Sequence, residues 1–168
     1  MGMVAAGPAF PNHGRCAWTS SPSSDIGGTS ILTAAADKAG YRILAVDDDP
    51  LVLRALEAVL RVWGYEVLAA NGIDEAQRLL QACGKPDAVV TDYLLQDEDT
   101  GVMVLDEIRR IYGPGTPALV ITGNAQPGTL RRMVGSEVPI LEKPVNPKLL
   151  KAVVEQICNG DPRAAHMR

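Results

Sequence analysis

Polar side chains with complementary chemistry stand at the ends of four short apolar segments of this 168-residue chain. They are three carboxylates, a hydroxyl and an ammonium group: Asp47, Asp48, Asp92, Thr122 and Lys143. If the segments are strands of one parallel sheet, their carboxyl ends lie along one edge, where open α/β sheets bind ligands. Such a set of groups is suited to binding a divalent cation and moving a phosphoryl group onto a carboxylate.

These groups can share the work of phosphoryl transfer. Three clustered carboxylates repel one another, and a cation such as Mg²⁺ removes that repulsion while orienting a phosphoryl group. One carboxylate can act as the nucleophile and form an acyl phosphate. The Lys143 ammonium can neutralise charge on the phosphoryl oxygens, and the Thr122 hydroxyl can donate a hydrogen bond to one of them.

Each motif taken alone has a plainer explanation. Acidic residues before a helix usually cap it, and Asp49 followed by Pro50 is fully explained as such a cap. A strand-end threonine, a Lys-Pro turn and an acidic loop such as residues 97–99 are ordinary surface features. The placement of all five groups at the ends of successive apolar segments is what favours a shared site.

From residue 41 onward, short apolar runs alternate with amphipathic stretches of helical spacing. The expected strands are residues 43–46, 65–69, 88–91, 118–121 and 138–141. Helices are expected after Asp49-Pro50, after Asn71, around residues 104–111, over 127–134 and after Asn146-Pro147. Five strands alternating with five helices predict a doubly wound parallel sheet with helices on both faces.

Composition divides the chain into a folded domain and two tails. Residues 1–38 are rich in glycine, proline and serine and lack periodicity, so a flexible tail or linker is expected there. The domain is expected over residues 39–160, followed by a short tail, 161–168. No segment of domain size follows, so no DNA-binding output domain is expected. The net charge of −4 also argues against a nucleic-acid surface dominated by lysine and arginine.

Composition also bears on the compartment. No apolar run approaches the roughly 20 residues of a membrane span and no signal peptide is evident, so a cytoplasmic protein is expected. The scattered cysteines Cys16, Cys83 and Cys158 favour thiols over a disulfide framework or a zinc site. The two histidines, His13 and His166, lie in the tails, which excludes histidine catalysis in the folded part.

Four short motifs make the chain resemble the receiver domain of two-component response regulators, from about residue 41 to residue 157. They are Val46-Asp47-Asp48-Asp49-Pro50, Thr91-Asp92-Tyr93, Ile121-Thr122-Gly123 and Glu142-Lys143-Pro144. The intervals between the motifs also fit that family. The resemblance implies a five-stranded (βα)5 flavodoxin-like fold with strand order 2-1-3-4-5.

The same resemblance implies a modification site and a metal site. Asp92 would be the phosphorylated residue. Asp48 and Asp92 would ligate Mg²⁺ directly, together with the main-chain carbonyl of Leu94. Asp47 would act on the metal largely through water.

The resemblance also assigns the remaining polar groups and exposes two departures. Thr122 and Lys143 would contact the phosphoryl group, and the Lys143–Pro144 peptide bond would be cis. Gly123 stands where alanine is commoner, and Ile140 stands where the family usually has a tyrosine or phenylalanine switch residue. The usual threonine–aromatic switch is therefore not expected, although phosphorylation is.

The implied partners are a histidine kinase or a histidine phosphotransfer protein as donor, and a downstream signalling protein. The loop after Asp92 resembles that of receivers attached to hybrid histidine kinases. The domain is expected not to be an enzyme.

Two alternatives to this function remain open. One is a pseudo-receiver that only binds partners, against which the complete set of polar residues argues. The other is a Mg²⁺-dependent phosphatase of the haloacid dehalogenase type, whose Asp-x-Asp-Thr pattern is broken here by Pro50 and Leu51.

Overall fold

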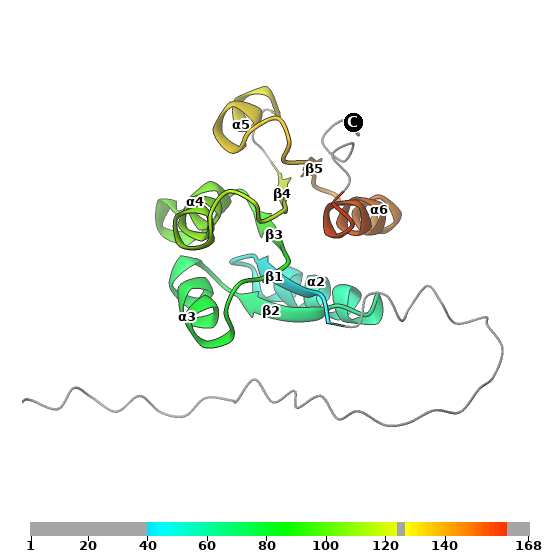
Figure 1. Cartoon of the computed structure of the whole chain (residues 1–168). Helices are drawn as coiled ribbons and strands as arrows, with labels where there is room; N and C mark the ends of the chain where they lie inside the picture. Colours follow the sequence, from blue (N-terminus) through cyan, green and yellow to red (C-terminus); the bar gives the residue numbers. More distant parts are fainter. Residues whose placement is uncertain (1–39, 124–126, 161–168) are drawn as a thin grey trace, which may run out of the picture.

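The computed structural model describes residues 40–123 and 127–160, which form a parallel sheet with helices on both faces (Figure 1). The elements in chain order are β1 (Arg42–Val46), α2 (Pro50–Val62), β2 (Glu66–Ala70), α3 (Ile73–Cys83), β3 (Ala88–Asp92), the 3-10 turn η1 (Gln96–Glu98), α4 (Gly101–Tyr112), β4 (Ala118–Thr122), α5 (Pro127–Val134), β5 (Ile140–Glu142) and α6 (Pro147–Cys158). The strand order is β2-β1-β3-β4-β5, which confirms the predicted topology. The predicted tails, 1–38 and 161–168, lie outside the described residues.

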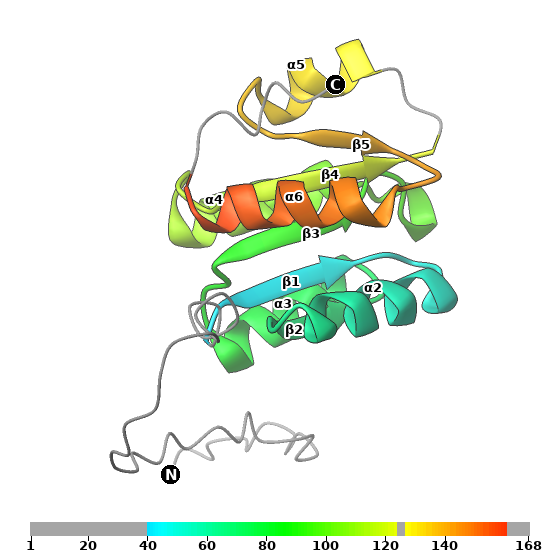
Figure 2. The ribbon, with the colours of Figure 1, turned by 90° about the vertical axis from the view of Figure 1, so that its right-hand side faces the viewer.

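Two layers of helices cover the sheet. Helices α2 and α6 pack on one face, and α3 and α4 pack on the other (Figure 2). In β1, Ile43 and Ala45 belong to the α2–α6 side, whereas Leu44 and Val46 belong to the α3–α4 side. Because successive side chains of a strand point to opposite faces, this continuous apolar run is buried on both. The burial holds the strands in register and brings the carboxyl ends of β1, β3 and β4 to one edge.

The two cap-plus-proline pairs start helices as predicted. The Asp49 side chain accepts hydrogen bonds from the amides of Leu51 at 2.8 Å and Val52 at 3.4 Å, and Pro50 occupies the first turn of α2. Asn146 caps α6 by accepting from the Lys148 amide at 2.9 Å. These caps satisfy amide groups that no helical carbonyl can reach.

The predicted cap of α3 is wrong by one residue. Gly72 holds the N-cap position, and it has no side chain that could make a capping hydrogen bond. The Asn71 amide instead donates to Glu75 Oε2 at 2.9 Å. A carboxylate in the first turn thus reaches back to the chain before the helix, as in the second half of a capping box.

The second strand begins one residue later than predicted. Tyr65 is buried, but its amide donates to the Leu60 carbonyl at 3.2 Å and so completes the end of α2. Gly64, with a φ of 92°, allows the chain to turn there. The strand therefore starts at Glu66.

The fifth strand is shifted from the predicted residues 138–141 to Ile140–Glu142. The Val138 amide donates to the Gly135 carbonyl at 3.4 Å in a turn, and Pro139 has no N–H to give to the sheet. Only the Pro139 carbonyl joins β4 before the strand proper. The predicted helix over residues 127–134 is present as α5.

Two of the three cysteines lie in the part of the chain that the structure describes. Cys158, at the end of α6, is a thiol, as expected from the sequence, and Cys83 is the last residue of α3. Cys16 lies outside the described residues.

The loop between β3 and α4 contains a strained residue. Glu98 has a φ of 66°, a left-handed conformation that costs an ordinary residue about 1–2 kcal/mol. Glycine relieves that cost and adds about 0.5–1 kcal/mol of backbone entropy to the unfolded state. We therefore expect Glu98→Gly to raise the free energy of unfolding by about 0.5 kcal/mol in urea denaturation. A clear fall in stability would show that this conformation carries no strain.

Candidate functional site

The predicted polar residues meet at the carboxyl edge of the sheet. Asp47 and Asp48 follow β1, Asp92 ends β3, Thr122 ends β4, and Lys143 follows β5. The pairing of β3 with β4 sets Asp92 beside Ile121, one residue before Thr122. One carboxylate oxygen from each of the three aspartates lies within 4.8 Å of the others. The structure therefore brings together the side chains of Asp47, Asp48, Asp92 and Lys143, and Thr122 ends the strand that lies between β3 and β5.

The Lys143 ammonium joins two of the carboxylates. Its Nζ atom lies 2.6 Å from Asp92 Oδ2 and 3.2 Å from Asp47 Oδ2. The Lys143 amide donates to the Thr122 carbonyl at 2.7 Å, and the following peptide bond to Pro144 is cis, as the resemblance implies. The backbone thus holds the lysine where one positive charge offsets part of the repulsion between carboxylates.

Backbone amides hold the remaining oxygens of the same two carboxylates. Asp92 Oδ1 accepts from the Tyr93 amide at 2.7 Å, and Asp47 Oδ1 accepts from the Asp49 amide at 3.0 Å. Asp47 is only 2% exposed and Asp92 only 8% exposed. Both carboxylates are therefore oriented before any ligand arrives, and one edge of Asp92 remains open to solvent.

The site holds more negative charge than its own lysine can balance. Burial raises the pKa of Asp47, although the Asp49 amide and Lys143 oppose that rise. Burial alone would lower the pKa of Lys143, but hydrogen bonds and charges from Asp92 and Asp47 outweigh it and raise that pKa. The lysine is therefore a permanent cation, and the aspartate cluster would gain from a second positive charge.

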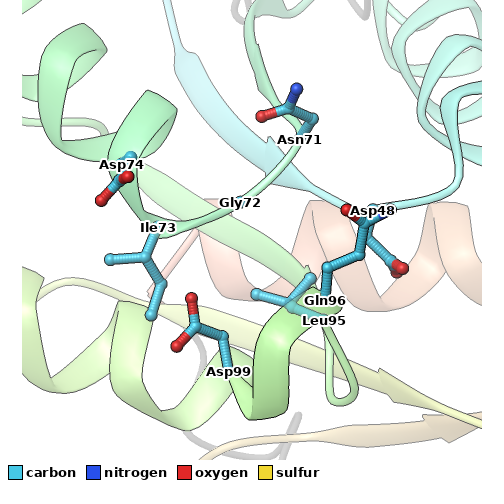
Figure 3. Close-up of a pocket in the computed structure, with 8 residues that line it drawn as sticks. All are labelled: Asp48, Asn71, Gly72, Ile73, Asp74, Leu95, Gln96 and Asp99. Atoms are coloured by element: carbon cyan, nitrogen blue, oxygen red, sulfur yellow. The ribbon is translucent and has the colours of Figure 1, made fainter.

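Asp48 connects the aspartate cluster to a polar pocket of about 190 Å³. Figure 3 shows the pocket between the loop after β1, the start of α3 and the segment before α4. Its lining residues are Asp48, Asn71, Gly72, Ile73, Asp74, Leu95, Gln96 and Asp99. Three carboxylates within reach of one another, beside a polar space that can hold water, suit Mg²⁺, which prefers oxygen ligands and keeps several waters.

The main chain passes close to the carboxylates at Leu94, where the resemblance implies a metal-binding carbonyl. Leu94 lies two residues after Asp92 and forms an isolated antiparallel bridge with Thr100. That bridge fixes the start of the loop close to the carboxylates. The ligation of a metal by the Leu94 carbonyl stays a prediction.

An apolar groove of about 330 Å³ opens beside the carboxylates on the other side of the site. Its lining residues are Asp47, Val52, Ala55, Leu56, Val59, Asp92, Ile121, Lys143, Pro144, Val145, Pro147 and Leu150. One wall is α2, and the other is the start of α6 with the loop before it. Sequence reasoning missed the groove because helical spacing does not show which apolar residues of α2 stay exposed, as Val52 does at 38%.

Sequence reasoning also missed Thr91 and the Tyr93 amide. The Thr91 hydroxyl donates to the main-chain carbonyl of Asp92 at 2.9 Å, and Thr91 is fully buried. The sequence did offer one indication of its role, because Thr91 is the one residue with a hydroxyl in the otherwise apolar run at residues 88–91. The amide of Tyr93 leaves no trace in the sequence, because every residue but proline has one.

Comparisons with known proteins agree with this geometry. Residues 43–155 match the response regulator receiver domain family. A receiver protein of known structure from Sinorhizobium medicae WSM419 is 30% identical, with a TM-score of 0.64, over 70% of this chain and 94% of that one. The transcriptional regulatory protein AruR of Pseudomonas aeruginosa is 34% identical over 65% of this chain and 46% of its own length. GlrR of Escherichia coli K12, also a transcriptional regulatory protein, is 32% identical over 67% of this chain and 25% of its own length.

The fold and site define a doubly wound α/β domain with an acidic pocket at the carboxyl edge of its sheet. The chain belongs to the response regulator receiver domain family of two-component systems. It spans less than half the length of the curated relatives AruR and GlrR. In the part of the chain that the structure describes, no helix has the length and apolar character to cross a membrane.

The departure at Ile140 is visible in the structure. Ile140 begins β5 opposite Val120 and is half-buried against the α3–α4 side of the core. A branched aliphatic side chain there is stiff and presents neither a ring nor a hydroxyl. Any signal from the site must therefore leave by a route other than an aromatic ring at this position.

Proposed function

We propose that Asp92 accepts a phosphoryl group from a phosphohistidine on a histidine kinase or a histidine phosphotransfer protein. The observation that carries this proposal is the short contact of 2.6 Å between Lys143 Nζ and Asp92 Oδ2. Asp92 also belongs to the cluster of three carboxylates at the carboxyl edge of the sheet. Membership of the receiver family supports the same assignment. The domain acts as an acceptor, not as an enzyme, and works in the cytoplasm.

The chain's own groups divide the chemistry between them. An Asp92 carboxylate oxygen attacks phosphorus, the phosphorus–nitrogen bond breaks, and its electron pair returns to the donor imidazole. Lys143 neutralises charge on the phosphoryl oxygens, and the Thr122 hydroxyl donates to one of them. Asp47, Asp48, Asp92 and the Leu94 carbonyl would hold Mg²⁺, which supplies further positive charge when bound.

The apolar groove is the proposed docking surface for a protein donor. It begins at Asp92 and Lys143 and continues along α2, so a donor helix lying in it would bring its histidine to the acceptor. The phosphorylated domain then passes the phosphoryl group on or binds a downstream signalling protein. An attachment to a hybrid histidine kinase remains part of this proposal.

A side chain that fills the groove should separate docking from chemistry. Ala55 lines the groove and is exposed, so Ala55→Gln adds bulk there without adding charge or disfavouring the helix. We expect phosphotransfer from a panel of phosphohistidine donor proteins to slow about tenfold, the loss of roughly 1.4 kcal/mol of binding. Acetyl phosphate, which needs no docking surface, should react at the unchanged rate.

The matched control is Ala58→Gln on the same helix, because Ala58 is exposed and does not line the groove. This variant should react normally with both kinds of donor. Equal rates for Ala55→Gln and Ala58→Gln with every protein donor that phosphorylates the wild type would remove the groove from the proposal.

The direct test of the proposed function uses the wild-type chain with acetyl phosphate. Incubation with Mg²⁺ should produce one phosphoryl adduct by intact-mass analysis, and chelation of the metal should prevent it. Trapping of the acyl phosphate by borohydride and peptide mapping should place the adduct on Asp92. Absence of any adduct would favour the pseudo-receiver, and rapid turnover of unrelated phosphate esters would favour a phosphatase.

A further inference from the structure

We infer that Thr91 is a positioning residue for the acceptor carboxylate and that Gly101 keeps the space this arrangement needs. The inference rests on the proposed role of Asp92 as phosphoryl acceptor. It concerns how the backbone next to Asp92 sets the orientation of the carboxylate.

The peptide unit between Asp92 and Tyr93 is held at both ends. Its carbonyl accepts a hydrogen bond from Thr91 Oγ1 at 2.9 Å. Its N–H donates to Asp92 Oδ1 at 2.7 Å. Because a peptide unit is planar and rigid, a tilt at the carbonyl end also moves the N–H that holds the carboxylate.

The same N–H is shared with a second acceptor. It donates to the Ile121 carbonyl in β4 at 2.7 Å, as well as to the Asp92 carboxylate. The tilt of the Asp92–Tyr93 peptide plane decides how strongly this N–H binds each acceptor, the Ile121 carbonyl or the Asp92 carboxylate. The Thr91 hydroxyl, which holds the carbonyl end, therefore acts on the acceptor through the Tyr93 amide.

The start of α4 closes over this peptide unit. A Cβ atom on Gly101 would lie 2.2 Å from the Asp92 carbonyl oxygen and 2.6 Å from Thr91 Oγ1, distances that real Cβ atoms do not show. The Gly101 amide donates to the Tyr93 carbonyl at 2.9 Å, which holds the helix at this close approach. Glycine is required here because of the packing, since this approach leaves no room for a side chain.

Packing alone does not explain the hydroxyl of Thr91. Thr91 is fully buried in a strand whose other residues at 88–90 are apolar. Valine has nearly the same shape and would fill the same volume without burying a polar group. The hydroxyl is explained by what it bonds, the carbonyl of the acceptor residue.

The test compares Thr91→Val with Thr91→Ser in the full chain. Thr91→Val should lower the plateau rate of phosphorylation by saturating acetyl phosphate about fivefold, the factor expected for one lost hydrogen bond. Thr91→Ser, which keeps the hydroxyl, should restore most of the rate. Hydrogen exchange of the Tyr93 amide should become about fivefold faster in Thr91→Val and stay near the wild-type value in Thr91→Ser.

Thr116→Val is the matched control. Thr116 precedes β4 at the opposite edge of the sheet, and its buried hydroxyl has no hydrogen-bond partner among the described residues. Losing that hydroxyl should change neither the phosphorylation rate nor exchange of the Tyr93 amide. Gly101→Ala should slow phosphorylation more than Thr91→Val in any preparation that retains the wild-type far-UV circular dichroism.

Three results would overturn the inference. They are a wild-type plateau rate in Thr91→Val, an equal loss in Thr91→Ser, and a loss of rate in Thr91→Val without faster exchange at Tyr93. A failure of the wild type to accept phosphate would instead contradict the proposed function. The wild-type protein in the same assay therefore distinguishes a failure of this inference from a failure of the proposed function.

Discussion

Asp92→Asn is expected to abolish phosphorylation, with a loss of about a thousandfold or more in the rate with acetyl phosphate. Asparagine keeps the shape of the side chain and one oxygen that can accept from the Tyr93 amide, a bond that measures 2.7 Å in the wild type. It lacks the negative charge that makes the oxygen a nucleophile, and it loses the ion pair with Lys143 at 2.6 Å. The change therefore removes the chemistry while leaving the volume of the site nearly unchanged.

Intact-mass analysis after treatment with acetyl phosphate and Mg²⁺ measures this loss. The matched control is Asp106→Asn on α4, an exposed carboxylate away from the edge where the aspartates meet, which should react like the wild type. A full-strength adduct in Asp92→Asn would mean that another residue accepts the phosphoryl group. Asp47 and Asp48 would then be the residues to examine, because their oxygens lie within 4.8 Å of Asp92.

The parts of the fold that followed from sequence are those with local signals. Asp49-Pro50 and Asn146-Pro147 each combine a capping side chain with a proline that fits the first turn, and both start helices where predicted. The apolar run at residues 43–46 of β1 is typical of a strand buried on both faces, and the structure confirms it. The start of β2 and the bounds of β5 were misplaced because their limits depend on bonds to Leu60 and Gly135 in turns outside the sheet.

The candidate site shows the same division between residue type and geometry. The five polar side chains could be named because each ends an apolar segment, and a parallel sheet gathers such ends. No pattern in the sequence reveals that Lys143 pairs with Asp47, 96 positions earlier, as well as with Asp92. The groove was missed for a related reason, since only the packed structure shows which apolar residues of α2 stay exposed.

Asp48→Asn is expected to weaken Mg²⁺ binding about a hundredfold, whereas Asp47→Asn should weaken it about tenfold, the range for groups that act behind the direct ligands. Both oxygens of Asp47 are already engaged, one by Lys143 at 3.2 Å and one by the Asp49 amide at 3.0 Å. Asp48 is half-buried, faces the polar pocket and makes no ion pair among the residues that the structure describes. Its oxygens are therefore the ones available to bind a metal directly.

Thermal unfolding with and without Mg²⁺ checks this order. A ligand at a hundred times its dissociation constant adds about 2.7 kcal/mol to the free energy of unfolding, and that increment should nearly vanish in Asp48→Asn. Asp74→Asn is the matched control, because Asp74 lines the same pocket but lies outside the aspartate cluster (Figure 3). It should keep the wild-type response.

A larger loss of Mg²⁺ stabilisation in Asp47→Asn than in Asp48→Asn would reverse the assignment and make the more buried carboxylate the direct ligand.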